Sequence, residues 1–201
     1  MSVDAAHADA GPSPGELAVR ALFAVLHGAA VGELPAFAWT LDLPQRQLLA
    51  LITEHLPEAL TVIPLSGQRY ASLRQQVPRE FHDLLDLMLA ARAPTVPLAA
   101  AERSARVIAA ACFGRRYLWR DLGLRGREDV ALLFATYFPA LYRANARNQI
   151  WKRFLFAEIS ARRGSAPLHP PNCVRCEDFT NCFPAHPDDA PAGLPGGTEK
   201  T

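Results

Sequence analysis

Three of the four cysteines lie in one ten-residue window near the C-terminus, Cys173, Cys176 and Cys182, with the spacing C-x2-C-x5-C. Two residues between cysteines let both sulfurs turn towards one point, as in zinc sites and iron–sulfur clusters. A third thiolate at this distance can close one face of a polynuclear centre. Soft thiolates select zinc, copper(I) or iron–sulfur centres over magnesium or calcium, and they also suit molybdenum held through sulfide. The window is therefore the candidate metal site.

The spacing leaves the fourth ligand and the metal open. It is not the C-x3-C-x2-C spacing of radical-forming clusters, and it lacks the second ligand pair of a zinc finger or ribbon. His169 lies four residues before Cys173, and His186 lies four residues after Cys182. Cys112 falls on the apolar face of an expected helix, so we interpret it as a small core residue. A structural zinc site is the main alternative to an iron–sulfur centre, and reduced thiols without a metal are a further one.

Composition narrows the function classes. The chain has 201 residues, with 21 basic and 20 acidic side chains and a net charge of +1. This balance argues against a general nucleic-acid or membrane-surface binder. The N-terminus lacks a basic leader with an apolar core, and no stretch is long enough to span a membrane. A cytoplasmic protein is expected, and in that reducing compartment cysteines act as metal ligands or catalysts more often than as disulfides.

No enzymatic constellation accompanies the cysteines. The chain has no G-x-S-x-G, no glycine-rich phosphate loop and no H-E-x-x-H, so we expect no catalytic residues and no enzyme. A basic cluster precedes the window: Arg143, Arg147, Lys152, Arg153, Arg162 and Arg163. Such a cluster could attract an oxyanion such as molybdate or an acidic protein surface, but the more common interpretation is the solvated face of a helix.

Apolar residues recur with a period of 3.6 in six segments, which predicts an all-α bundle of about six helices and an irregular C-terminal loop that contains the cysteines. Ser13 and Glu16 form a capping-box pattern at the first helix. Gly114 is expected to cap the fourth helix. Pro64 interrupts residues 60–65, which we expect to be a loop. The first expected helix runs from residue 13 to about residue 28 or 32, and the others span residues 44–56, 78–93, 98–113, 127–138 and 140–160.

The composition also divides the chain. Residues 1–12 are small and polar, which predicts a disordered N-terminus, and residues 13–163 form the helical domain. Seven of the seventeen prolines follow residue 166. We expect a metal- or cluster-binding loop over residues 164–184 and a flexible tail over residues 185–201.

Several blocks follow one another in order: Ile108–Gly114, Leu118–Leu124, a helix stopped by Pro139, Trp151–Leu155 and then the cysteine window. In this order the blocks resemble the NifQ family of nitrogen-fixation proteins. The resemblance covers about residues 15–184 and is strongest from residue 104 on. It implies a carrier of a molybdenum–iron–sulfur cluster that donates molybdenum for biosynthesis of the nitrogenase iron–molybdenum cofactor. The implied partners are the nitrogenase iron protein and the cofactor assembly scaffold, with molybdate or another molybdenum source.

The resemblance also implies a ligand set. The family pattern is C-x4-C-x2-C-x5-C, and its last three cysteines fall on Cys173, Cys176 and Cys182, while its first falls on Leu168. Either His169 replaces the missing thiolate, or the cluster keeps an open site that an exogenous ligand or the partner fills. The alternative function is a helical interaction module with a structural zinc site in its C-terminal loop.

Overall fold

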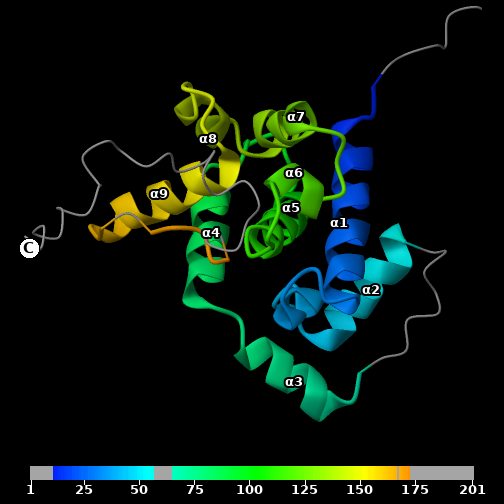
Figure 1. Ribbon diagram of the computed structural model, residues 1–201. Coiled ribbons are helices and arrows are strands. Elements are labelled where there is room, and N and C mark those ends of the chain that lie inside the picture. The colour runs from blue at the N-terminus through cyan, green and yellow to red at the C-terminus, as the bar shows by residue number, and fades with distance from the viewer. Residues whose placement is uncertain (1–10, 57–64, 167, 173–201) are drawn as a thin grey trace, which may run out of the picture.

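The computed structural model describes residues 11–56, 65–166 and 168–172. In these residues the fold is all helical, as the apolar periodicity predicts. The elements, drawn in Figure 1, are α1 (Pro14–Ala30), the 3-10 helix η1 (Ala36–Thr40), α2 (Gln45–His55), α3 (Gly67–Gln75), α4 (Arg79–Ala90), α5 (Leu98–Ala111), α6 (Leu118–Asp121), α7 (Arg127–Tyr137), α8 (Pro139–Ala144) and α9 (Trp151–Arg163).

Helix α5 is the central element of the bundle. It packs against α1 on one side and α4 on the other, α9 packs on α4, and α7 packs on α1 and α8 (Figure 1). Most of α5 is fully buried, including Ala101, Ala105 and the run Ala109–Ala111. Small side chains let the neighbouring helices approach closely. Large aromatic side chains fill the space around them, among them Phe81, Phe134, Phe138 and Phe156.

The local signals at the helix ends are partly confirmed. The hydroxyl of Ser13 accepts a hydrogen bond from the Glu16 amide, and the Glu16 carboxylate accepts one from the Ser13 amide, which completes the predicted capping box of α1. Gly164 ends α9 in the left-handed conformation, with φ of 60°. Gly114 does not cap α5, because the helix ends at Ala111 and its C-cap is Cys112, which has right-handed backbone. The prediction for Gly114 was therefore wrong.

Among the described residues the structure has more helices than predicted, because two short ones, α3 and α6, carry little apolar period and one expected helix is split in two. Helix α3 buries Tyr70 alone, and α6 is only four residues long. The expected helix over residues 140–160 is two helices, α8 and α9. Between them the side chain of Asn145 makes two hydrogen bonds to the backbone of Gln149. Its Nδ2 donates to the Gln149 carbonyl (3.1 Å), and its Oδ1 accepts from the Gln149 backbone N–H (2.8 Å). These bonds replace helical backbone bonds.

Other predictions fall wholly or partly outside the described residues: the N-terminus 1–12, the loop 60–65, the cysteine window and the tail 185–201. Among the described helices, none has the length and apolar character needed to cross a membrane.

Candidate metal centre

The structure describes the segment that leads to the cysteine window. Cys173, Cys176 and Cys182 lie outside the described residues, and the described chain ends at Asn172. His169 is exposed. Among the described residues no group of three His, Cys, Asp or Glu side chains could hold a metal ion. Ligation by His169 and the three cysteines therefore stays a prediction.

Residues 168–172, here called the stem, fold back from the end of α9. The Leu168 amide donates to the hydroxyl of Ser160 (2.8 Å), and that hydroxyl donates to the Phe156 carbonyl (2.7 Å). Leu168 is half-buried against the hydrophobic core, and Pro170 is buried. Leu168, at the position where the resemblance implies a cysteine, is thus a packing residue in this chain.

Asn172 fixes the end of the stem. Its side-chain amide donates to the Phe113 carbonyl at 3.0 Å, and its backbone is left-handed with φ of 65°. Asparagine tolerates this conformation better than most residues with a side chain. The residue directly before Cys173 is therefore held against the segment that follows α5.

That segment, residues 113–116 and here called the platform, is stabilised by Lys152 of α9. The ammonium group donates to the carbonyls of Gly114 (3.0 Å) and Arg116 (2.7 Å) and to Oδ2 of Asp121 (2.6 Å). The side chains of Lys152 and Asp121 are 6% and 0% exposed. A buried ion pair is stable only when such additional hydrogen bonds satisfy it, and here the carbonyls do so.

Asp121 binds the platform as well. It accepts hydrogen bonds from the Arg116 amide (3.3 Å) and from Nε of Arg116 (3.1 Å). Burial disfavours the charge on Arg116, but the hydrogen bonds and charges of Asp121 and Glu33 outweigh it and raise the pKa of Arg116. A Cβ atom on Gly114 would overlap the Asp121 carboxylate and Leu34. A glycine at position 114 is thus required for the close approach of the platform backbone to Asp121 and Leu34.

The structure divides the predicted basic cluster. Lys152 lies in the core, and Arg163 pairs with Glu80 and Asp83 of α4, whereas Arg143, Arg147, Arg153 and Arg162 are exposed. Sequence reasoning missed the role of Lys152. The signal was present, because Lys152 shares one helical face with Leu155, Phe156 and Ile159. Cys112 is fully buried, as expected for a core residue.

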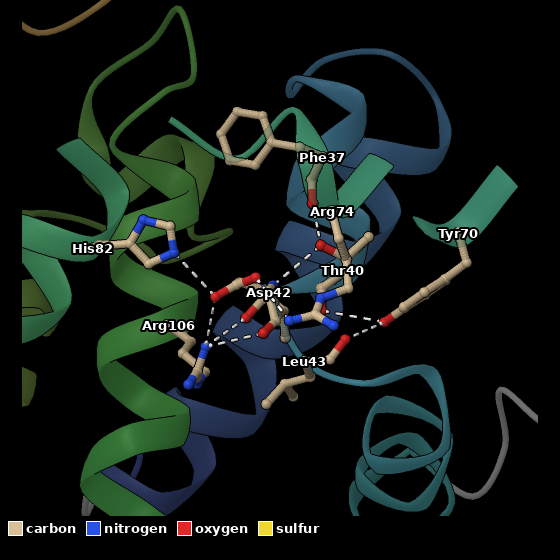
Figure 2. Close-up of polar contacts among 9 residues, drawn as sticks. Phe37, Thr40, Asp42, Leu43, Tyr70, Arg74, His82 and Arg106 are labelled. Atoms are coloured by element: carbon tan, nitrogen blue, oxygen red, sulfur yellow. Dashed lines mark hydrogen bonds and ion pairs between the residues drawn. The ribbon is translucent and has the colours of Figure 1, made fainter. Parts of the chain in front are cut away.

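A second polar cluster, also missed, surrounds Asp42 in the turn between η1 and α2. Figure 2 shows Arg74 of α3, His82 of α4 and Arg106 of α5 converging on its carboxylate, at 3.3, 3.2 and 3.7 Å. Leu41 and Asp42 both have positive φ, 48° and 54°. One carboxylate shared by three basic side chains joins α3, α4 and α5 to the turn between η1 and α2, and we interpret it as structural.

Tyr70 holds α3 to the same cluster. Its hydroxyl donates to the Leu43 carbonyl at 3.0 Å (Figure 2), and burial raises its pKa to about 12. The phenol therefore stays protonated and remains a hydrogen-bond donor throughout the ordinary pH range.

Comparisons with known proteins identify the family. The NifQ family model matches residues 21–184. A protein named Protein NifQ from Azotobacter vinelandii is 32% identical over 165 residues, which cover 76% of this chain and 81% of the relative. Protein NifQ from Rhodobacter capsulatus is 34% identical over 79 residues, which cover 39% of this chain and 44% of the relative. No solved structure matches. The chain belongs to the NifQ family, with the expected blocks and the cysteine window inside the matched range.

Proposed function

We propose that this protein carries molybdenum in a molybdenum–iron–sulfur cluster and donates it for biosynthesis of the nitrogenase iron–molybdenum cofactor. Its membership of the NifQ family places it in nitrogen fixation. One observation carries the finer proposal: the family match continues to residue 184, across Cys173, Cys176 and Cys182, and these begin one residue after the anchored Asn172.

The chemistry of the ligands fits a cargo that must be released. Three thiolates bind iron and sulfide-bridged molybdenum well, while a set of three protein thiolates leaves room for an exchanging ligand. In this proposal His169 is the fourth ligand. The protein acts by ligand exchange at a docked partner in the cytoplasm and not by turnover of a substrate. The proposed partners are the nitrogenase iron protein and the cofactor assembly scaffold.

Metal analysis of anaerobically purified protein tests the proposal. From cells replete in iron and molybdate, the protein should be brown, absorb in the visible range and contain iron and molybdenum. Cys173→Ala, Cys176→Ala and Cys182→Ala should each lose most of both metals. The matched control is Cys112→Ala, which removes a buried thiol from the core and should keep them. Colourless protein with one zinc per chain would overturn the carrier proposal in favour of a structural zinc site.

The fourth ligand has its own test. His169→Ala should weaken cluster retention and alter the visible spectrum if the imidazole binds the cluster. His27→Ala on α1 is the control, since His27 stacks on Phe23 at the outer face of that helix. Unchanged metal content and spectrum in His169→Ala would assign the fourth position to an exogenous ligand.

A further inference from the structure

The near-zero net charge hides an uneven distribution. Residues 115–172 contain eleven basic and four acidic side chains, a net charge of +7, whereas the described residues from 11 to 114 contain eight of each. The positive half comprises α6 to α9. Charges of one sign that line a hollow surface raise the local concentration of counter-ions there. The positive half is therefore where an anionic ligand would gather.

This half contains a cleft of about 540 Å³ between α7, α8 and the beginning of α9. Figure 1 shows α8 beside α7, next to the first turn of α9. Arg127 and Arg143 both line the cleft, together with Tyr142 and Trp151. Glu128 is the one acidic residue in the lining. The cleft thus combines two guanidinium groups with the exposed ring of Tyr142 and the edge of the largely buried Trp151.

Both guanidinium groups keep donors available. Arg127 donates from Nη2 to the carbonyl and side-chain oxygens of Asn148 (both 2.8 Å) and to the Gln149 carbonyl (3.1 Å), all of them neutral acceptors. Within the described part of the chain, neither Arg127 nor Arg143 forms an ion pair with a carboxylate. The bonds from Nη2 hold Arg127 in place, while its charge and its remaining N–H groups are available to a ligand.

The size of the cleft and its donors indicate the ligand class. A planar guanidinium binds a carboxylate through two parallel hydrogen bonds, and two guanidinium groups match two carboxylates. Clefts of about 300–1,000 Å³ hold small organic ligands. A single inorganic oxyanion, only a few times larger than a water molecule of about 30 Å³, would leave most of the space empty. Tyr142, which is exposed, provides apolar surface for a carbon skeleton.

We propose that the cleft between α7, α8 and α9 binds a small organic anion with two or more carboxylate groups, held by Arg127 and Arg143. The carboxylate of Glu128 repels further negative charge on a ligand, and it can accept a hydrogen bond from a hydroxyl group of the ligand. The site shares no residue with the cysteine window, so its test stands apart from the proposed molybdenum cargo. Cys173→Ala should bind the anion as the unaltered protein does.

Calorimetric titration of the full chain with citrate, tricarballylate and sulfate tests the site. The two tricarboxylates should bind with dissociation constants below about 1 mM, and sulfate should bind at least about tenfold more weakly. Arg143→Gln should weaken citrate binding by about tenfold, the loss of one charge-assisted pair. The matched control is Arg147→Gln, an exposed arginine four residues further on that does not line the cleft. It should bind citrate within about twofold of the unaltered protein.

Three results would overturn the proposal. Equal losses in Arg143→Gln and Arg147→Gln would assign binding to the general positive field. No binding of either tricarboxylate at a ligand concentration 10 times the expected dissociation constant would show that the cleft does not select carboxylates. A glutamate-rich peptide that binds more tightly than citrate, with the same dependence on Arg143, would make the cleft a docking surface for an acidic protein. Equal thermal unfolding of the variants would show that each comparison concerns folded protein.

Discussion

The ammonium group of Lys152 lies 2.6 Å from Oδ2 of Asp121, and both side chains are buried. The same ammonium group binds two carbonyls of the platform, and Asn172 binds a third carbonyl, that of Phe113. Helix α9, the platform and the stem of the cysteine window are therefore one hydrogen-bonded unit. The position of Asn172, the last described residue before the window, depends on residues that are 20 to 60 positions away in the sequence.

Replacement of Lys152 by methionine should destabilise the protein by about 3–5 kcal/mol, because it leaves the Asp121 carboxylate buried without its main partner. Urea unfolding measures the change. Arg153→Met, on the exposed face of the same helix turn, should cost less than about 0.5 kcal/mol. The double variant Lys152→Met/Asp121→Asn should recover part of the loss. A loss in Lys152→Met no larger than that in Arg153→Met would contradict the buried-pair interpretation.

Gly114→Ala should destabilise the protein by about 1–3 kcal/mol, the usual cost of inserting atoms into a packed site, because the new methyl group would overlap Asp121 and Leu34. Gly67→Ala is the matched control. Gly67 begins α3 and has open space around it, so this change should be neutral or slightly stabilising. Thermal unfolding of the two variants provides the comparison, and equal melting temperatures would show that Gly114 tolerates a side chain.

Asn172→Ala should loosen the stem more than Asn172→Gly does. Both variants lose the hydrogen bond to Phe113, which contributes about 1 kcal/mol to stability. In the alanine variant the left-handed backbone, which glycine adopts freely, costs about 1 kcal/mol more. Hydrogen exchange at the Leu168 amide reports on the stem directly. Exchange should be fastest in Asn172→Ala, slower in Asn172→Gly and slowest in the unaltered protein. If the window binds the cluster, metal content should be lowest in Asn172→Ala and highest in the unaltered protein. Identical exchange in all three proteins would remove Asn172 as an anchor.

Asp129 should make stability depend on pH in the acid range. The guanidinium group of Arg125 donates to its carboxylate at 2.8 and 3.1 Å, and the Arg125 amide donates at 3.1 Å. The side-chain hydrogen bond from Arg125 is the main cause that lowers the pKa of Asp129 below its ordinary value of 3.8. A lowered pKa stabilises the fold above the unfolded-state pKa, and this contribution is lost as pH falls through the folded-state pKa.

Asp129→Asn isolates this contribution, since its side chain does not ionise. Urea unfolding from pH 7 to pH 2 should give a free-energy difference between the two proteins that is constant above about pH 5 and shrinks as the pH falls below about 4. A difference that stays constant down to pH 2 would show that the pKa of Asp129 is the same in the folded and unfolded states.

The sequence alone determined the features that depend on neighbours along the chain. The capping box of Ser13 and Glu16 involves residues three apart, and the long amphipathic helices follow from apolar residues on one face. The cysteine spacing and the ordered blocks identified the family, which the comparisons confirm. In each case the signal lies in local spacing or in the order of short motifs along the chain, so no tertiary contact was needed to find it.

Only the tertiary structure decided where charges and unusual backbones are tolerated. Lys152 is buried because Gly114, Arg116 and Asp121 surround it with acceptors. Helix α3 has little apolar surface, and it is held by Tyr70 and by the contact of Arg74 with Asp42. A buried charge is stable only when partners from distant segments repay its desolvation, and no local pattern in a sequence specifies which segments will meet.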